Sequence, residues 1–329
     1  MRTPAAGVTL ASLQAGVQPR LEKVKHELRR SVASDFPLIS EVNGHLLQMQ
    51  GKMFRPTLLL LAEEASGAQD ARAERLAAVI ELTHLATLVH DDSVDHSVLR
   101  RGMPTINALF SHQVSVIMGD YLYSRAMVEL TRLDDLEPMR VMARVTNEMT
   151  VGEMRQLMAH EPLDFSEYEY DLLIKAKTAS LLSAACELGA LRAGARERDA
   201  LRRFGEQLGM AFQIVDDLLD YTEQETVTGK PSGNDLREHK VTLPLIYALD
   251  RLTPAARAEV ATLMKTAEPD DTQISRVIAL VAEAGGLDYA RGRGQRLAEG
   301  ADQALDELPP SPARETLRDS ITYVLDRRR

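Results

Sequence analysis

Two short acidic motifs are the residues of this chain best suited to chemistry. The pattern Asp-Asp-x-x-Asp occurs twice, as Asp91, Asp92 and Asp95 and then as Asp216, Asp217 and Asp220. Residues four apart lie on one face of a helix, so the outer carboxylates of each motif converge. Clustered carboxylates repel one another, most strongly at the negative end of a helix dipole, and need a cation to offset them. Oxygen ligands of this kind suit Mg²⁺, with substrate phosphates completing its shell.

A solvated helix end is the simpler interpretation of one such motif taken alone. Here each copy ends a strongly apolar predicted helix, and the second copy makes a solvated end a poor explanation for both. The sequence therefore predicts two acidic helix ends that share one metal-binding cavity.

The elements that carry these motifs are expected to be helices, because helical periodicity dominates and no convincing series of alternating strands occurs. We expect an all-α fold in one domain covering residues 1–329. The expected helices cover about 12–33, 38–50, a segment starting near Pro56, 71–98, 112–133, 138–159, 166–192, 197–221, 242–250, 254–265, 271–283, 286–307 and 311–326. Residues 228–235 are expected to form a loop because of their glycines and proline.

Composition excludes several classes of function. Acidic residues outnumber basic ones, 49 to 39, which argues against nucleic acid as a partner because phosphate backbones require a basic surface. Cys186 is the only cysteine, so a cysteine-rich zinc site is excluded and an inert core thiol is expected. No apolar run approaches the ~20 residues of a membrane span. We read the first residues as a frayed terminus rather than a signal peptide, and a reducing cytoplasm is the simplest compartment.

Further motifs, together with the two aspartate motifs, resemble those of the trans-isoprenyl diphosphate synthase family, specifically its long-chain polyprenyl members. The resemblance runs from about Gly51 to Ala248. It rests on residues 51–56 (Gly-Lys-Met-Phe-Arg-Pro), 84–90 (His-Leu-Ala-Thr-Leu-Val-His), 100–105 (Arg-Arg-Gly-Met-Pro-Thr), 177–179 (Lys-Thr-Ala), 212–214 (Phe-Gln-Ile), 229–236 (Gly-Lys-Pro-Ser-Gly-Asn-Asp-Leu) and 240–244 (Lys-Val-Thr-Leu-Pro). It implies a single large antiparallel helix bundle around a central cavity.

The resemblance also implies a role for each matching residue. Those that would hold the diphosphate of isopentenyl diphosphate are Lys52, Arg55, His84 and Arg101. Those that would hold the allylic diphosphate are Arg100, Lys177, Thr178, Gln213, Lys230 and Lys240. The six aspartates would bind Mg²⁺, three ions per active site, some of them through water. Lys177 would also take part in catalysis.

The chain departs from the family pattern at one position. His239 stands where the family commonly has glycine before the lysine that corresponds to Lys240. Glycine permits a positive φ and histidine adopts one rarely, so the backbone of this loop is in question.

The reaction implied by the resemblance is ionisation, condensation and proton loss. Mg²⁺ and basic side chains would stabilise the charge that develops on the departing diphosphate. The double bond of isopentenyl diphosphate would attack the allylic cation, and the released diphosphate is a plausible base.

Small residues upstream of the first aspartate motif predict a long product. A helix rises by about 5.4 Å per turn, which is comparable to one isoprene unit. The residues one and two turns before Asp91 are Ala86 and Thr87, then Thr83, and small side chains there would leave a tunnel open. We expect a heptaprenyl to decaprenyl product, with octaprenyl as the single guess, of the kind used for quinone side chains. Helix packing alone is the alternative explanation for the small residues. Candidates for the tunnel floor are Met118, Tyr121, Leu122 and Tyr123.

Other functions remain open at this point. A geranylgeranyl or farnesylgeranyl diphosphate synthase would share every motif. A non-catalytic subunit of a heteromeric synthase usually lacks one aspartate motif, and a terpene cyclase usually mixes Asn, Ser and Glu in its second site. A di-metal carboxylate protein would need paired Glu-x-x-His segments, and only Glu81 and His84 fit that spacing. The expected partners are the two diphosphate substrates and a second copy of the chain, with at most peripheral membrane contact during product release.

Overall fold

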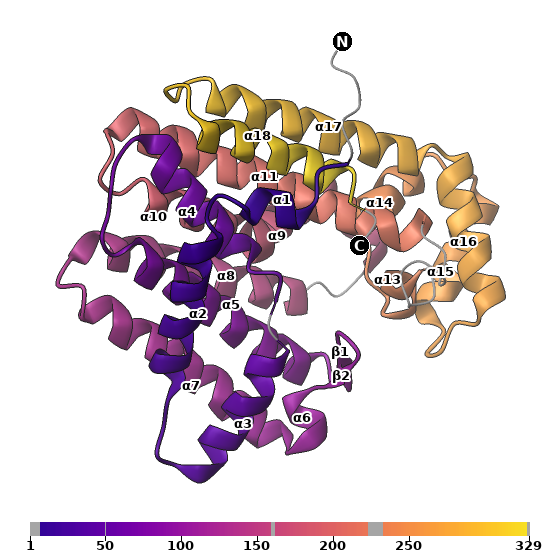
Figure 1. Ribbon diagram of the computed structural model, residues 1–329. Coiled ribbons are helices and arrows are strands. Elements are labelled where there is room, and N and C mark those ends of the chain that lie inside the picture. Colours follow the sequence, from indigo (N-terminus) through magenta and orange to yellow (C-terminus); the bar gives the residue numbers. More distant parts are fainter. Residues whose placement is uncertain (1–6, 50, 159–161, 223–232, 328–329) are drawn as a thin grey trace.

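The computed structural model describes residues 7–49, 51–158, 162–222 and 233–327 (Figure 1). Its longer helices are α2 (Gln18–Val32), α3 (Pro37–Gln48), α4 (Phe54–Ser66), α5 (Ala73–Val94), α7 (His112–Thr131), α8 (Leu136–Met158), α9 (Glu167–Ile174), α10 (Ser180–Gly189), α11 (Ala195–Thr222), α14 (Leu243–Leu249), α15 (Pro254–Lys265), α16 (Asp271–Glu283), α17 (Gly286–Leu305) and α18 (Pro312–Leu325). Short helical segments are α1 (Leu10–Gln14), α6 (Ile106–Leu109), α13 (Asn234–Arg237) and the 3-10 turn Pro162–Asp164. The all-α prediction is confirmed.

Two buried helices organise the molecule. Helix α5 is apolar on nearly every side, which is typical of a helix surrounded by others. It packs against α7, α2, α4 and α10, whereas α11 packs against α17 and α10. Helix α10 therefore contacts both central helices, and each central helix carries one aspartate motif at its C-terminal end.

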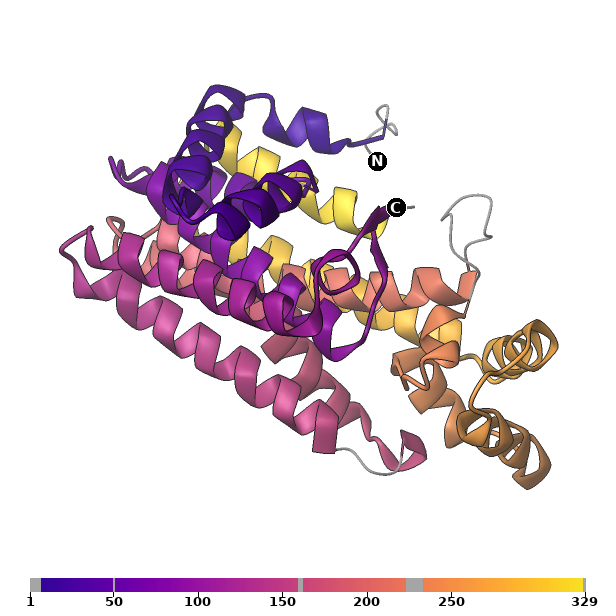
Figure 2. The same cartoon turned by 90° about the horizontal axis from the view of Figure 1, so that it is seen from below.

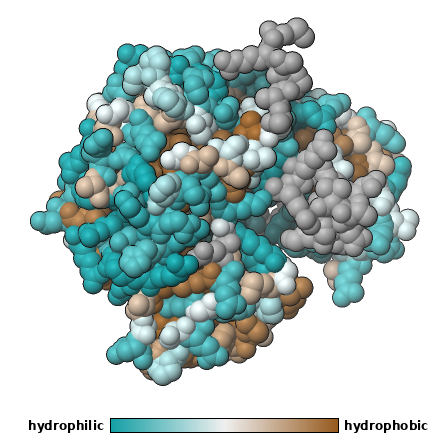
Figure 3. Space-filling view, in the orientation of Figure 1, coloured by the Kyte–Doolittle hydropathy of each residue, from teal (hydrophilic) through white to brown (hydrophobic). Residues whose placement is uncertain are grey.

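The remaining helices surround this centre. Helices α17 and α18 cross the upper part of Figure 1, while α15 and α16 form a group on the right. Seen from below, α7 and α8 run as two long neighbouring helices, and α15 and α16 stand to the side (Figure 2). A space-filling view shows a hollow between the left-hand body and this right-hand group (Figure 3).

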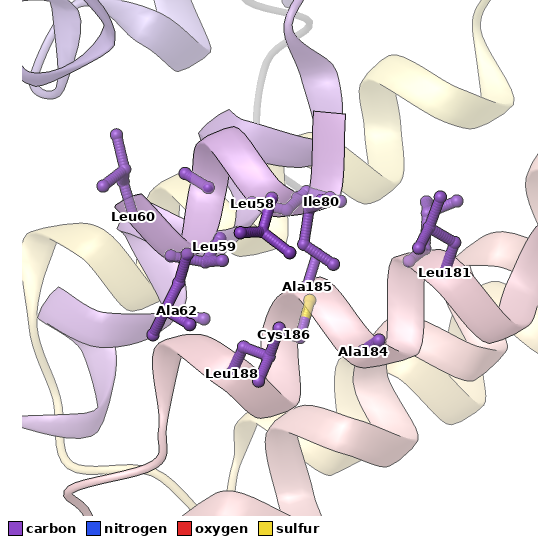
Figure 4. Packing of buried hydrophobic residues seen from close by; sticks show 14 of the residues in the cluster. Leu58, Leu59, Leu60, Ala62, Ile80, Leu181, Ala184, Ala185, Cys186 and Leu188 are labelled. Carbon is purple, nitrogen blue, oxygen red and sulfur yellow. The ribbon is translucent and has the colours of Figure 1, made fainter. Parts of the chain in front are cut away.

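The main hydrophobic core lies where α4, α5 and α10 meet (Figure 4). Leu58, Leu59 and Ile80 are fully buried there, and Cys186 lies among them with no exposed surface. Burial raises the pKa of the Cys186 thiol above its ordinary value, which keeps it protonated. The prediction that Cys186 is a core residue is confirmed.

Several predicted helices are correct at their ends because capping residues define them. Asp270 forms a capping box at the start of α16, and Thr253 caps α15 ahead of Pro254. The bounds predicted for both helices, 254–265 and 271–283, are confirmed.

Other boundaries were wrong. The helix predicted over 12–33 is broken into α1 and α2, with Pro19 in the first turn of α2. The helix predicted over 71–98 ends at Val94, and His96 then adopts a φ of 50°. A two-stranded hairpin follows it, in which β1 (Leu99–Arg100) pairs antiparallel with β2 (Met103–Pro104).

The helix predicted over 166–192 is interrupted in its middle. Residues Lys175–Ala179 form a π-helical turn between α9 and α10, which we call the π-turn. Such turns occur mostly as single interruptions of α-helices, frequently at functional sites. No helix among the described ranges is both long enough and apolar enough to cross a membrane.

Candidate active site

Both aspartate motifs open on one cavity of about 1080 Å³. Asp92 and Asp95 line it from the end of α5, and Asp216 and Asp217 line it from α11. The cavity is also lined by basic and polar residues predicted to bind diphosphate: Lys52, Arg55, His84, Arg100, Arg101, Lys177, Thr178, Gln213 and Lys240. The fold thus joins residues that lie up to about 190 positions apart in the sequence.

The three aspartates of the first motif have different surroundings. Asp92 is buried, and Arg100 Nε donates to both of its oxygens at 2.8 and 2.9 Å. Asp91 Oδ2 lies 3.8 Å from Lys177 Nζ, and Asp95 Oδ2 lies 4.0 Å from Lys240 Nζ. Burial raises the pKa of Asp91 from 3.8 to about 6, although the Lys177 charge opposes the shift. Asp91 and Asp95 therefore face lysine side chains at longer range, whereas Asp92 is held by hydrogen bonds from Arg100.

In the second motif, two aspartates accept hydrogen bonds from within the protein and one faces a cationic side chain. Asp217 accepts hydrogen bonds from Tyr170 Oη at 2.5 Å and from Gln213 Nε2 at 2.7 Å, one on each oxygen. Asp220 accepts the backbone N–H groups of Asn234 and Asp235, both at 3.0 Å. Asp216 Oδ1 lies 3.1 Å from Arg327 Nη1. Burial raises the pKa of Asp217 to about 7, against the effect of its two hydrogen-bond donors.

The π-turn presents two adjacent side chains to the cavity. Lys177 Nζ pairs with Glu153 Oε1 of α8 at 2.8 Å, and Thr178 Oγ1 donates to Gln213 Oε1 of α11 at 2.7 Å. Thr178 thereby orients the amide that donates to Asp217. The cation and the hydroxyl thus connect both acidic clusters through one short segment.

We call the part of the cavity between α4, α5 and the hairpin the second basic pocket. Arg55 and His84 line the cavity there, and the buried Glu81 lies between their helices. Burial lowers the pKa of Arg55 to about 10, and in the described part of the structure its buried Nε has no hydrogen-bond partner. Burial and nearby arginines lower the pKa of His84 well below 6.5, so this imidazole is neutral. The pocket therefore combines a buried arginine with a donor that has hydrogen-bonding capacity to spare.

Arg101 packs closely against the backbone of Gly51, where this pocket meets the loop before α4. A Cβ on Gly51 would lie 3.1 Å from Arg101 Nη1 and 3.3 Å from Glu81 Oε1. Arg101 Nη1 also donates to the carbonyl of Met49 at 2.9 Å. The bare backbone at Gly51 therefore lets the Arg101 guanidinium pack against the loop at the pocket edge.

Comparisons with known proteins show the family to which this chain belongs. The polyprenyl synthetase family model matches residues 36–281. The chain belongs to the polyprenyl synthetase family.

Two curated members are similar along most of their length. An all-trans-nonaprenyl-diphosphate synthase (geranyl-diphosphate specific) of Rhodobacter capsulatus is 40% identical over 91% of this chain and 92% of that protein. An octaprenyl diphosphate synthase of Escherichia coli is 38% identical over 86% of this chain and 88% of that protein. This synthase is therefore a prenyltransferase of the all-trans polyprenyl diphosphate class.

A solved structure agrees with the fold. The polyprenyl synthase of Caulobacter crescentus, crystallised with calcium and isoprenyl diphosphate, superposes with a TM-score of 0.92. It is 32% identical and covers 99% of this chain and 100% of that chain. The prediction of an isoprenoid-synthase-like helical fold is confirmed.

The unusual His239 does not disrupt its loop. His239 has a φ of 56°, the left-handed backbone that glycine adopts easily, and its ring donates to the Thr266 carbonyl at 2.9 Å. The backbone N–H of Lys240 donates to the Asp235 carbonyl at 2.8 Å, and its side chain lines the cavity. The histidine of this synthase thus takes the glycine conformation and secures it with one hydrogen bond. Lys230, the other lysine predicted for this loop, lies outside the described residues.

The residues predicted to set product length lie on α5, one to two helical turns before Asp91. Thr83 and Ala86 are buried, with 1% and 3% of their surface exposed, and the Thr83 hydroxyl donates to the Val79 carbonyl at 2.9 Å. The Thr87 hydroxyl donates to His84 O at 2.8 Å. None of the three is among the described residues that line the cavity. Their role in product length stays a prediction.

Sequence reasoning missed several cavity residues. Glu81, Glu153, Tyr170, Asp235 and Arg327 all line the site. The spacing of Glu81 and His84 fits a di-metal carboxylate site, but the charged neighbours of Glu81 in the structure are Arg55 and Arg101. Glu81 could have been predicted from the sequence, because it is a carboxylate in an otherwise apolar helix and such a group needs a cationic partner.

The acidic cluster makes the metal-free synthase sensitive to pH. Burial raises the pKa of Asp91 to about 6, of Asp217 to about 7 and of Asp235 to about 8. The folded state then holds protons that the unfolded state has released, so stability falls as the pH rises through this window. We expect the unfolding temperature in EDTA to be lower at about pH 8.5 than at about pH 6.5.

Thermal unfolding followed by circular dichroism measures this effect. Asp217→Asn is the matched variant, because it keeps the shape of the side chain and should flatten the dependence. An unfolding temperature that rises with pH over the same window would contradict the prediction.

Proposed function

We propose that this synthase extends an allylic diphosphate by repeated head-to-tail condensation with isopentenyl diphosphate, with Mg²⁺, to a long product for which octaprenyl is the best guess. One observation carries the proposal. Two acidic helix ends and basic side chains from α4, α5, the hairpin, the π-turn and the loop before α14 line the same cavity. A reaction between two diphosphate esters needs two anion pockets and a cation cluster between them. The whole chain of 329 residues would act as one catalytic domain.

The donor set suits Mg²⁺ bound together with a substrate. The side chains of both motifs offer oxygen ligands only, and no group of three His, Cys, Asp or Glu among the described residues converges closely enough to hold an ion alone. Diphosphate oxygens would complete each shell. We assign direct contacts to Asp91, Asp95 and Asp216, which face displaceable cations. The other three aspartates, whose oxygens accept internal hydrogen bonds, would act through water. Three ions per site are proposed, and Mg²⁺ there would neutralise charge on the leaving diphosphate.

The protein's own groups would guide each step. Lys177, Thr178, Gln213 and Lys240 would hold the allylic diphosphate while its C–O bond breaks and the bonding electrons leave with the diphosphate. Arg55, His84, Arg101 and Lys52 would hold isopentenyl diphosphate so that its double bond attacks the allylic carbon. The proton lost from the new cation would pass to the released diphosphate. Because the required base is supplied by the substrate, no side-chain nucleophile is needed. Arg100, which pairs with Asp92, would add charge beside the allylic diphosphate.

Incubation with labelled isopentenyl diphosphate and each allylic starter tests the proposal. Chromatography of the products should show long all-trans chains that require Mg²⁺. Absence of condensation with every starter would reject the function, and products that stop at geranylgeranyl would reject the long-chain assignment.

Product length has its own test at Ala86. Ala86→Phe is expected to shorten the main product, because a phenyl ring about one helical turn below Asp91 would block a chain running along α5. Ala86→Ser, which stays small, is the control. The chromatographic distribution reports length independently of how much enzyme folds, so an unchanged distribution in Ala86→Phe would reject the tunnel assignment.

We also propose that the synthase is a homodimer in the cytoplasm that contacts membranes only peripherally. Large apolar side chains are exposed on one helix, including Val116 at 38% and Ile117 at 63% on α7. A helix face of this kind suits an interface between two copies. Light scattering after size exclusion should give twice the mass of 36.4 kDa.

A further inference from the structure

The π-turn must satisfy two demands at once. Lys177 has to reach Glu153 of α8 and Asp91 of α5, while the next residue, Thr178, has to reach Gln213 of α11. Closing with i→i+5 hydrogen bonds, such as Ser180 N–H to the Lys175 carbonyl, widens the turn beyond that of an α-helix. A wider turn takes more room from the helices packed on either side.

Two glycines provide that room. Gly152 of α8 faces Ala176, and a Cβ built on Gly152 would lie 2.6 Å from the Ala176 Cβ. Gly209 of α11 faces Ala179, and a Cβ there would lie 2.5 Å from the Ala179 Cα. Contacts this short do not occur between real Cβ atoms, because carbon atoms pack at about 3.5–4.0 Å. Both helices thus approach the π-turn more closely than any other residue type would permit.

Backbone conformation does not explain these glycines. Both lie inside α-helices, and neither is among the glycines with positive φ. Glycine in a helix interior is destabilising relative to alanine. Close approach to the π-turn is therefore the physical reason for glycine at both positions.

We propose that Gly152 and Gly209 are positioning residues that hold the π-turn so that Lys177 and Thr178 face the allylic diphosphate. Each glycine leaves a space on its helix into which the π-turn packs, and we call these two spaces sockets. The inference rests on the proposed role of those two residues. Neither glycine touches a substrate, and each acts through the segment it contacts.

A double-variant cycle isolates the first socket. Gly152→Ala should displace the π-turn, because the Ala176 Cβ is fixed to the backbone and cannot swing aside. Ala176→Gly removes the clashing atom and leaves the new Cβ 3.8 Å from the Ala176 Cα, an ordinary contact. The double variant Gly152→Ala/Ala176→Gly should therefore restore the position of Lys177.

Steady-state kinetics with each substrate varied in turn gives the readout. We expect Gly152→Ala to lower kcat/KM for the allylic substrate by about tenfold to a hundredfold. A loss of this size is expected when a group in the active site is displaced by about 1 Å. KM for isopentenyl diphosphate should stay within about twofold, since Arg55 and Arg101 lie on other elements. Ala176→Gly and the double variant should lie within about threefold of the wild type. Gly44→Ala on α3 is the matched control, because nothing lies within 4 Å of its added Cβ.

The outcomes distinguish a wrong role for Lys177 from a wrong role for Gly152. If Lys177→Ala is as active as the wild type, the role of Lys177 is wrong. If Lys177→Ala is inactive but Gly152→Ala has wild-type kinetics, the socket is wrong. If Gly152→Ala does not fold, the double variant decides alone: a folded, active double variant supports the socket, and an inactive or unfolded one overturns it.

Discussion

Asp91→Ala and Asp216→Ala are each expected to lower kcat by about a thousandfold or more, which corresponds to about 4 kcal/mol of transition-state stabilisation. These two carboxylates come from the C-terminal ends of two different helices, α5 and α11, and lie beside the cationic side chains of Lys177 and Arg327. Removing either one removes a ligand whose charge matters most when the diphosphate departs. Measured at saturating substrates and increasing Mg²⁺, the loss should persist.

The surroundings of the aspartates supply the controls. Asp319→Ala on the exposed face of α18 should keep wild-type turnover. Asp217→Asn should lose less than Asp216→Ala, because an amide can keep part of the hydrogen-bond pattern with Tyr170 and Gln213. Near wild-type kcat in Asp91→Ala or Asp216→Ala at high Mg²⁺ would show that the metal assignment is wrong.

Arg101→Met should raise KM for isopentenyl diphosphate by about a hundredfold while KM for the allylic substrate changes little. The backbone of Arg101 has a φ of 53° in the hairpin. Its side chain packs against Gly51 and donates a hydrogen bond to the Met49 carbonyl. This anchoring fixes the guanidinium at the edge of the second basic pocket before any substrate binds. A preorganised fork of donors loses little entropy on binding a phosphate, so its removal should mainly affect binding.

Two further variants define that effect. Arg101→Lys keeps the charge without the planar fork and should give an intermediate KM. Arg140→Met removes an exposed arginine elsewhere, 69% accessible, and should have no effect. A larger change in KM for the allylic substrate than for isopentenyl diphosphate would reverse the assignment of the two pockets.

The parts of this structure that could be predicted from sequence are those encoded locally. The bounds of α15 and α16 follow from Thr253, Pro254 and Asp270, which act on their own helix. The convergence of both aspartate motifs on one cavity was likewise predictable, because each motif follows apolar residues on a helix face that has to be buried.

The features that were missed depend on residues distant in sequence. The segment Lys175–Ala179 contains good helix formers, and what accompanies its wider turn is the close packing of Gly152 and Gly209. The separation of Asp92 and Asp217 from the other aspartates could not be predicted either. For Asp217 it arises from Tyr170, which lies 47 positions before its partner. For Asp92 it arises from Arg100, which is only 8 positions away but is brought back by the hairpin, an element that helical periodicity does not predict.

The deeply buried Cys186 makes this synthase a convenient subject for site-specific labelling. Its thiol is enclosed by α4, α5 and α10 and stays protonated, so maleimide reagents should leave the folded protein unmodified. A cysteine introduced at an exposed position away from the cavity, such as Asp319 on α18, could then carry a fluorophore without removal of the native thiol. In the unlabelled protein, the rate at which Cys186 reacts would report how often the centre of the bundle opens.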